Sequence, residues 1–351
     1  MLEDKLVDVN IAGELEVLTT PRELRKEIAI DDDSAQFVYD GRKEVNAILD
    51  GSDDRLLMVV GPCSIHDPEE ALEYARLLQP LAEKVKDKML VVMRTYFEKP
   101  RTRIGWKGLL YDPGMDDSAD MEKGMRMSRQ LLLDLAKMKV LTSTEFLSRN
   151  ASQFYGDLIS YASIGARTIE SPDHRHFPSG LSMAVGMKNG TCGSIDKALD
   201  AVITARSPNT FIGPNMDGRE CKIPTKGNAY AHMILRGGKD GSNYDQTSVD
   251  YALDILEKEG INTGLMIDAS HGNSGKQPEK QPGIVKEVIN LRNQGRNIAG
   301  VLVESYLLNG FQKLPFPYQG EPAIEKGTSK TDSCLGFEET EQMINQIYWV
   351  L

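Results

Sequence analysis

Five cationic side chains follow closely after short apolar runs of the sequence, and together they suit a small, highly charged anion. They are Arg94, Lys99, Arg167, Lys188 and Arg236. Guanidinium groups bind phosphate and carboxylate groups through paired hydrogen bonds, whereas clustered cations without an anion repel one another. If these cations meet at one opening, we expect a phosphate ester that also bears a carboxylate. Taken singly, each residue fits a surface ion pair equally well.

The residues after Lys99 extend this basic group. Arg101 adds a further cation and Thr102 a hydroxyl group. A cation and a hydroxyl together suit a second phosphate. The sequence therefore predicts a place for two phosphorylated ligands.

A second group of residues could hold a divalent metal ion. It comprises Cys63, His271, Glu304 and Asp332. These residues offer sulfur, nitrogen and oxygen donors, so Mn2+, Fe2+, Co2+ and Zn2+ all remain candidates. The spacing leaves two other interpretations open, namely that Cys63 is a buried structural thiol and that His271 is a hydrogen-bonded core histidine.

Eight short apolar runs, separated by segments with helical periodicity, must position both groups. The runs are Leu56–Val60, Leu90–Met93, Val140–Ser143, Ala162–Ile169, Met183–Met187, a sixth in either Thr210–Gly213 or Ala231–Leu235, Gly264–Ile267 and Ala299–Val303. Repeated βα units predict an α/β fold. We expect a (β/α)8 TIM barrel rather than a doubly wound sheet, because no Gly-x-Gly-x-x-Gly turn follows a predicted strand. Residues after barrel strands face one common opening, where the two groups would converge.

The first part of the chain is organised differently. Residues 1–45 are charged and weakly patterned, which predicts an N-terminal arm, and the barrel is expected over 46–351. A helix is expected over Gly41–Leu49.

Composition excludes several classes of protein. The 351 residues carry a formal net charge of -11, so the chain has no overall positive field for nucleic acid. No apolar run approaches the roughly 20 residues that a membrane helix needs, and the first ten residues lack the apolar core of a signal peptide. The four cysteines form no Cys-x-x-Cys pair, which argues against a disulfide framework and a zinc ribbon. We therefore expect a cytoplasmic protein without a nucleic-acid or membrane partner.

Eight motifs follow one another from about residue 45 to the C-terminus. They are Gly61–Asp67 (GPCSIHD), Phe97–Thr102 (FEKPRT), Gly105–Gly108 (GWKG), Gly165–Ser171 (GARTIES), Gly186–Thr191 (GMKNGT), Ile234–Gly238 (ILRGG), Asp268–Asn273 (DASHGN) and Val303–Ser305 (VES). In content and order they closely resemble the short-chain, microbial class I 3-deoxy-D-arabino-heptulosonate 7-phosphate (DAHP) synthases.

The resemblance implies a (β/α)8 barrel enzyme that condenses phosphoenolpyruvate with erythrose 4-phosphate, the entry step to the aromatic amino acids. It implies that Cys63, His271, Glu304 and Asp332 hold one divalent metal ion. It further implies that phosphoenolpyruvate is surrounded by Arg94, Lys99, Arg167, Lys188 and Arg236, and that Arg101 and Thr102 hold the aldose phosphate. In the mechanism that follows, Lys99 is the proton donor to the developing alkoxide, and Glu145 or the metal helps to deprotonate the attacking water.

Two segments depart from the family pattern, at 172–178 and 213–227. In relatives these regions lie near the pocket for an aromatic amino acid inhibitor and near subunit contacts, and the N-terminal arm takes part in both roles. We therefore expect a homodimer or homotetramer whose inhibitor the sequence does not identify. Two alternatives remain: a paralogue that uses a different phosphorylated aldehyde, and a non-catalytic barrel that binds aromatic metabolites.

Overall fold

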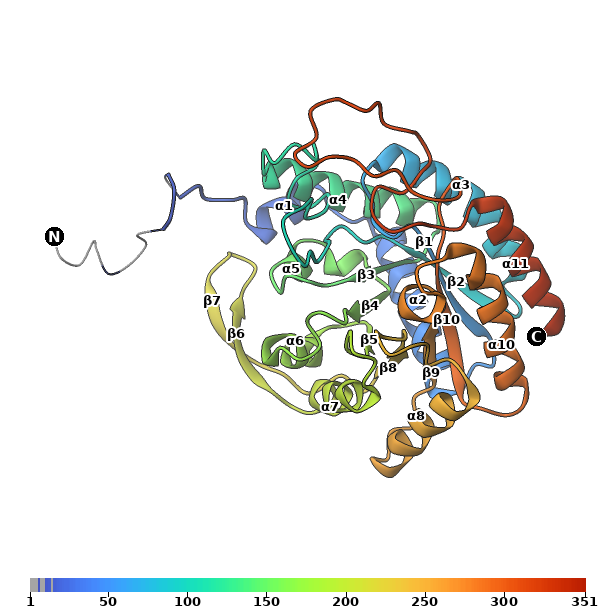
Figure 1. Cartoon of the computed structure of the whole chain (residues 1–351). Helices are drawn as coiled ribbons and strands as arrows, with labels where there is room; N and C mark the ends of the chain where they lie inside the picture. The colour runs from blue at the N-terminus through green and yellow to red at the C-terminus, as the bar shows by residue number, and fades with distance from the viewer. Residues whose placement is uncertain (1–5, 7–9, 14) are drawn as a thin grey trace.

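The computed structural model describes residue 6, residues 10–13 and residues 15–351. Eight parallel strands form a closed barrel in the spatial order β1-β10-β9-β8-β5-β4-β3-β2 (Figure 1). The strands are β1 (Leu56–Gly61), β2 (Met89–Arg94), β3 (Thr142–Glu145), β4 (Tyr161–Ile164), β5 (Ala184–Lys188), β8 (Ala231–Leu235), β9 (Leu265–Asp268) and β10 (Ile298–Glu304). The expected (β/α)8 TIM barrel is thereby confirmed.

Helices surround the barrel, and two more precede it. The surrounding helices are α3 (Pro68–Val85), α4 (Met121–Lys137), α5 (Ala151–Tyr155), α6 (Pro172–His176), α7 (Ile195–Arg206), α8 (Gln246–Lys258), α9 (His271–Ser274), α10 (Gln281–Asn293) and α11 (Phe337–Val350). The preceding helices are α1 (Pro21–Glu27) and α2 (Asp32–Asp50). No helix within the described residues is both long and apolar enough to cross a bilayer.

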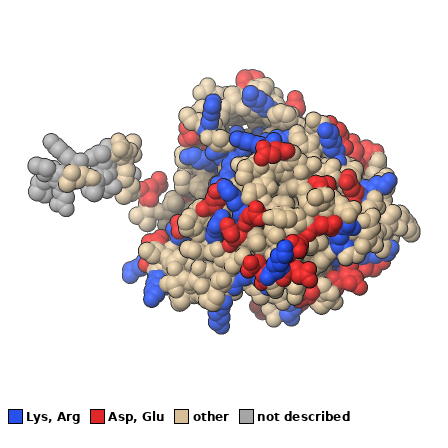
Figure 2. All heavy atoms as spheres, turned by 60° about the horizontal axis from the view of Figure 1, so that its bottom comes forward, with Lys and Arg blue, Asp and Glu red and all other residues tan. Residues whose placement is uncertain are grey.

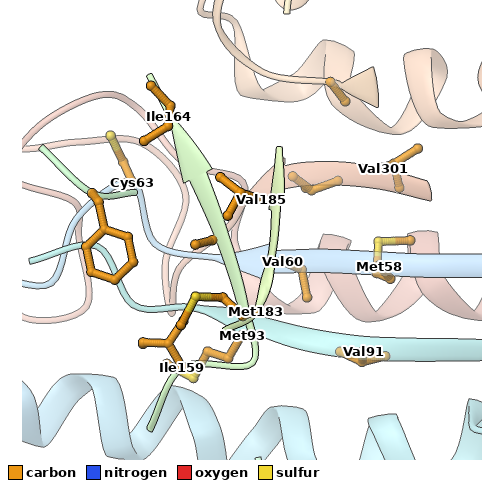
Figure 3. Close-up of a cluster of buried hydrophobic side chains, with 14 of the residues drawn as sticks. Met58, Val60, Cys63, Val91, Met93, Ile159, Ile164, Met183, Val185 and Val301 are labelled. Atoms are coloured by element: carbon orange, nitrogen blue, oxygen red, sulfur yellow. The ribbon is translucent and has the colours of Figure 1, made fainter. Parts of the chain in front are cut away.

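Most of the strands are largely apolar because both of their faces are buried, although β3 is polar and several strands end in a charged residue. On β1, Leu57 and Val59 belong to a cluster inside the barrel, whereas Met58 and Val60 pack with the surrounding helices. Figure 3 shows this outer layer, in which Met58 and Val60 lie near Val91 of β2. Side chains of successive strand residues point to opposite faces, so continuous apolar runs produce both layers at once.

Helix α2 closes the barrel at the amino ends of the strands. Val45, Ile48 and Leu49 join the cluster inside the barrel, and the Leu49 carbonyl accepts a hydrogen bond of 2.8 Å from the Gly264 amide. The boundary expected between residues 45 and 46 therefore falls inside α2. This helix is longer than Gly41–Leu49, because the Asp31 side chain caps it by accepting from the Ser34 amide.

Leu49→Ala should lower the free energy of unfolding by roughly 2–5 kcal/mol, since it leaves a cavity in the barrel interior. Leu49 is fully buried, whereas Leu77 on α3 is 44% exposed. Leu77→Ala is therefore the matched control and should cost no more than about 0.5 kcal/mol. Urea unfolding monitored by circular dichroism compares the two, and equal losses would contradict the closing role of α2.

The structure decides between the two candidates for the sixth barrel strand. Ala231–Leu235 is the barrel strand β8, and all five of its residues are buried. Thr210–Gly213 lies instead in β6 (Thr210–Pro214), which pairs with β7 (Glu220–Pro224) in a separate antiparallel hairpin. β6 exposes Thr210 and Ile212, which a strand covered on both faces could not do.

The fourth run is shorter than expected. β4 ends at Ile164, whereas the sequence suggested a strand continuing to Ile169. The amides of Thr168 and Ile169 both donate to the Gly165 carbonyl, so the chain turns directly after the strand. This turn carries Arg167 to the carboxyl end of the barrel.

The surface carries both signs of charge. Figure 2 shows Lys and Arg side chains interspersed with Asp and Glu over the face turned toward the viewer. This mixed surface agrees with the net charge of -11. The expectation that nucleic acid is not a partner remains a prediction.

Candidate active site

A pocket at the carboxyl ends of the barrel strands collects ten of the residues predicted from the sequence. They are Cys63, Arg94, Lys99, Glu145, Arg167, Lys188, Arg236, His271, Glu304 and Asp332. Arg101 and Thr102 line a neighbouring hollow, which shares Lys99 with the pocket. The Arg167 Nε donates to Thr102 Oγ1 at 3.3 Å and joins the two spaces. Every predicted site residue therefore lies in one of two adjoining hollows.

Three of the four candidate metal donors cluster on one side of this pocket, and the fourth, His271, lies beside one of them. A ligand atom from each of Cys63, Glu304 and Asp332 lies within 4.8 Å of the other two. His271 Nε2 lies 3.5 Å from Glu304 Oε1. Cys63 follows β1, His271 follows β9 and Glu304 ends β10, and these strands are neighbours in the closed barrel. Gly61 is in register with Glu304, and Asp332 lies in the loop between β10 and α11. The donor set suits a divalent transition metal and does not select among Mn2+, Fe2+, Co2+ and Zn2+.

Local backbone geometry places Cys63. Gly61 has a φ of +146°, and a Cβ there would lie 3.0 Å from the Arg94 amide nitrogen. Glycine therefore permits the chain to leave β1 close beside β2. Asp67 then caps α3 by accepting from the amides of Glu69 and Glu70, which fixes the far end of the same turn.

His271 has a left-handed backbone conformation, and a carboxylate orients its ring. Its φ is +53°, which is unusual for a residue with a Cβ. Its Nδ1 pairs with Asp268 Oδ2 at 2.9 Å, and this bond leaves Nε2 facing Glu304. A carboxylate on one ring nitrogen orients the other nitrogen toward a metal ion, as is usual for histidine ligands.

The electrostatics of Cys63 favour a bound cation. Burial, together with Glu304, raises the pKa of the Cys63 thiol, and the nearby Lys99 ammonium opposes this shift. Lys99 Nζ lies 2.7 Å from Cys63 Sγ. Because a metal ligand must be the thiolate, a divalent ion at this position would supply the charge that stabilises it.

Arg94 and Lys188 are buried cations at the base of the pocket. Arg94 donates to Glu304 Oε1 at 3.0 Å and to the Pro62 carbonyl at 3.2 Å. Its remaining nitrogen, Nη1, is buried with no hydrogen-bond partner among the described residues. An unpartnered buried guanidinium N–H is costly unless an acceptor binds to it. Arg94 therefore suits an anionic ligand.

Lys188 is paired with carboxylates on two sides. Its Nζ lies 2.9 Å from Glu145 Oε2 and 3.5 Å from Asp268 Oδ2. Burial by itself raises the pKa of Glu145, but Lys188, His271 and Lys99 outweigh burial and lower that pKa to about 2. Glu145 is therefore ionised at neutral pH and accepts a proton only weakly while Lys188 holds it.

Sequence reasoning missed several residues of the pocket. Tyr96, Glu98 and Lys276 also line it. The Tyr96 ring lies under the Arg94 guanidinium, with 4.0 Å between its centroid and Arg94 Cζ. Only their position in the sequence could have identified them, because all three lie within eight residues after a strand or after a predicted site residue. Nothing else in the sequence around these three loop residues indicated their role.

Glu98 fixes the loop that carries Lys99. Its carboxylate accepts from the amides of Leu147 and Ser148, both at 2.9 Å, and from the Tyr111 hydroxyl at 2.8 Å. Burial raises the pKa of Glu98 from 4.5 to about 7, although these hydrogen bonds oppose the shift. Between these two values the folded protein binds more protons than the unfolded chain, so stability falls as pH rises.

Wild-type protein should therefore lose stability relative to Glu98→Gln as the pH rises from about 5 to about 8, by up to roughly 1.4 kcal/mol per pH unit. The amide of the variant does not titrate, so its own curve lacks this contribution. Urea unfolding of both proteins across the range measures the difference. Parallel curves would show that Glu98 is ionised throughout.

Comparisons with known proteins agree with this geometry. Residues 27–345 match the model of the DAHP synthetase I family. The chain is 43% identical over 349 residues to a Tyr-sensitive phospho-2-dehydro-3-deoxyheptonate aldolase of Escherichia coli, covering 99% of this chain and 97% of that protein. It is 44% identical over 335 residues to a Phe-sensitive one from the same organism, covering 95% and 94%. The solved structure of a phospho-2-dehydro-3-deoxyheptonate aldolase from Francisella tularensis superposes with a TM-score of 0.93 at 41% identity, covering 97% and 98% of the two chains.

Proposed function

Because the chain belongs to the DAHP synthetase I family, we propose the following reaction for its pocket. As a DAHP synthase, the protein catalyses the first step of aromatic amino acid biosynthesis. Phosphoenolpyruvate, D-erythrose 4-phosphate and water give 3-deoxy-D-arabino-heptulosonate 7-phosphate and phosphate, and the reaction depends on one divalent metal ion. The observation that carries this proposal is the convergence of five cations and four metal donors on one pocket.

The cations bind and align the two anionic substrates. Phosphoenolpyruvate is surrounded by Arg94, Lys99, Arg167, Lys188 and Arg236, and the unpartnered Arg94 Nη1 takes one of its oxygens. Arg101 and Thr102 hold the phosphate of the aldose in the adjoining hollow. Two anions that repel one another in water are thus held side by side, and this positioning supplies much of the rate enhancement.

The divalent ion would be held by Cys63, His271, Glu304 and Asp332, and when bound it would supply Lewis acidity toward the aldehyde oxygen or toward a water molecule. Lys99 lies beside these donors, 3.8 Å from Asp332 Oδ2, and donates a proton to the alkoxide that forms as the new carbon–carbon bond closes. Removal of a proton from the water that attacks the former enol carbon would be assisted by the metal ion or by Glu145, which is a weak base while it is paired with Lys188. The resulting hemiketal then loses phosphate.

The proposal is tested by a phosphate-release assay with both substrates. We expect release to require phosphoenolpyruvate and erythrose 4-phosphate together. Phosphate release with a five-carbon aldose phosphate but not with erythrose 4-phosphate would show the paralogue instead. Binding of aromatic amino acids without turnover under any condition would show the non-catalytic barrel.

We propose that an aromatic amino acid also regulates the enzyme, since the relatives are named for sensitivity to Tyr or Phe. A cavity between the two divergent segments is lined by Phe177, Phe211 and Ile223 and would accept an aromatic ring. The assay repeated with Phe, Tyr and Trp identifies the inhibitor. The expected homodimer or homotetramer remains a prediction that light scattering checks.

Arg167→Ala should raise the KM for phosphoenolpyruvate by about ten- to a hundredfold, the effect of losing one hydrogen-bonded cation. Steady-state kinetics at saturating erythrose 4-phosphate measures this change. Arg296→Ala is the control, because Arg296 pairs with Asp250 beyond the amino end of β10. An unchanged KM in Arg167→Ala would remove this residue from the phosphoenolpyruvate site.

A further inference from the structure

Three buried asparagines lie beneath the loops that follow β5, β8 and β9. Asn189 is fully buried, and Asn243 and Asn273 are each 6% exposed. None of the three is among the residues that line the pocket. Asn189 and Asn273 fall within two of the motifs singled out in the sequence, but their chemistry is not used in the reaction.

The three amides form one continuous hydrogen-bonded network. Asn243 Nδ2 donates to Asn189 Oδ1 at 3.1 Å, and the Asn243 amide N–H donates to Asn273 Oδ1 at 2.9 Å. Asn273 Nδ2 donates to the Leu235 and Asp268 carbonyls. An asparagine side chain both donates and accepts, so a chain of amides can join three loops without burying a charge.

This network fixes the backbone of Arg236 from both sides. The Arg236 amide donates to Asn189 Oδ1 at 2.8 Å, and the Arg236 carbonyl accepts from the Asn273 amide at 3.2 Å. The next residue, Gly237, donates to Asn243 Oδ1 at 2.6 Å and accepts from Asn189 Nδ2 at 3.0 Å. Gly237 has a φ of +69°, and a Cβ there would lie 2.5 Å from the Asn273 nitrogen. The contact is therefore too close for any residue but glycine.

A main-chain hydrogen bond beside the network ties Lys188 to β8. Asn189 directly follows Lys188, and its own amide donates to the Ile234 carbonyl of β8 at 3.1 Å. Lys188 and Arg236 therefore share one rigid support. None of the hydrogen bonds named above joins the three asparagines to the loop after β2, which carries Arg101 and Thr102.

We propose that Asn189, Asn243 and Asn273 are positioning residues that hold Lys188 and Arg236 in the geometry that phosphoenolpyruvate requires, independently of the aldose phosphate site. This inference rests on the proposed assignment of Lys188 and Arg236 to phosphoenolpyruvate. The inference also predicts selectivity. Loosening the network should weaken binding of phosphoenolpyruvate and leave binding of erythrose 4-phosphate unchanged.

The test compares Asn189→Ala and Asn243→Ala with Asn228→Ala. Asn228 is a matched control: it is 7% exposed and its Nδ2 donates to the Pro178 and Met183 carbonyls, but it lies at the amino end of β8. We expect the first two variants to raise the KM for phosphoenolpyruvate about tenfold and to leave the KM for erythrose 4-phosphate within about twofold. Asn228→Ala should lower the melting temperature and change neither KM.

Asn243→Ser serves as a conservative variant should an alanine variant not fold. Its hydroxyl can accept from Gly237, so its KM for phosphoenolpyruvate should lie between those of wild type and Asn243→Ala. An unchanged KM for phosphoenolpyruvate, an equal rise for both substrates, or the same effect in Asn228→Ala would each overturn the proposal.

Arg236→Ala separates this inference from the proposed function. An unchanged KM for phosphoenolpyruvate in Arg236→Ala would show that the substrate assignment is wrong. A raised KM in Arg236→Ala together with unchanged values in the asparagine variants would show that the assignment holds and that the network does not position the residue.

Discussion

Cys63→Ala should abolish measurable turnover, with a loss of at least about a thousandfold in kcat, while the barrel stays folded. The variant removes the sulfur donor from a set in which Cys63, Glu304 and Asp332 place ligand atoms within 4.8 Å of one another. The remaining carboxylates are then left without the cation that offsets their mutual repulsion. His271→Ala should have the same effect, since His271 Nε2 faces Glu304.

Two controls separate metal loss from misfolding. Treatment of wild-type enzyme with EDTA should remove activity, and added Mn2+, Fe2+, Co2+ or Zn2+ should restore it in wild type but not in Cys63→Ala. Cys334→Ala is the matched variant, because Cys334 is also a fully buried thiol but is not one of the clustered donors. It should lose some thermal stability and keep its activity. Full activity in protein shown to be free of metal would refute the metal assignment.

Lys99→Met should lower kcat by about a hundred- to ten-thousandfold, the range expected for loss of a positioned proton donor. Burial by itself lowers the pKa of Lys99, but Cys63, Asp332 and Glu304 outweigh burial and raise it above its ordinary value. Lys99 is therefore protonated in the resting site and available to donate. Methionine keeps most of the length of the side chain and removes both the charge and the proton.

Lys99→Arg distinguishes proton donation from charge alone. Arginine keeps the positive charge but does not release its proton, so kcat should remain low while the KM for phosphoenolpyruvate stays near that of wild type. Lys276→Met is the matched control, since Lys276 Nζ also contacts Asp332, at 2.9 Å, but its side chain is 58% exposed. Its kcat should fall far less than that of Lys99→Met. A Lys99→Arg variant as fast as wild type would show that charge, and not proton transfer, is the contribution of Lys99.

Much of the barrel follows from local pattern. Seven of the apolar runs overlap one barrel strand each, because a parallel strand covered on both faces is largely apolar. β3 is the exception, since it is polar and the run Val140–Ser143 overlaps it only at Thr142 and Ser143. The sixth strand could not be chosen this way, since Thr210–Gly213 and Ala231–Leu235 are both short apolar runs. Only the exposure of Ile212 in the β6–β7 hairpin and the complete burial of β8 separate them.

The candidate site was predicted for a related reason. A charged residue directly after an apolar strand, such as Lys188 or Glu304, is conspicuous in the sequence, and the barrel rule sends all such residues to one end. Residues that support the site were not conspicuous. Asn243 lies in a polar loop, and Val45 of α2 lies in a segment that the sequence assigned to the N-terminal arm.

The sequence by itself determined the fold class, the opening toward which the charged residues face and the chemistry of the donors, because these depend on residue type and on periodicity along a short stretch of chain. Only the tertiary structure decided that α2 fills the amino end of the barrel, that Arg94 is bonded to Glu304 and that three asparagines hold Arg236. Those contacts join residues far apart in the chain, and their free energy appears only when the closed barrel brings the partners together and removes water from between them.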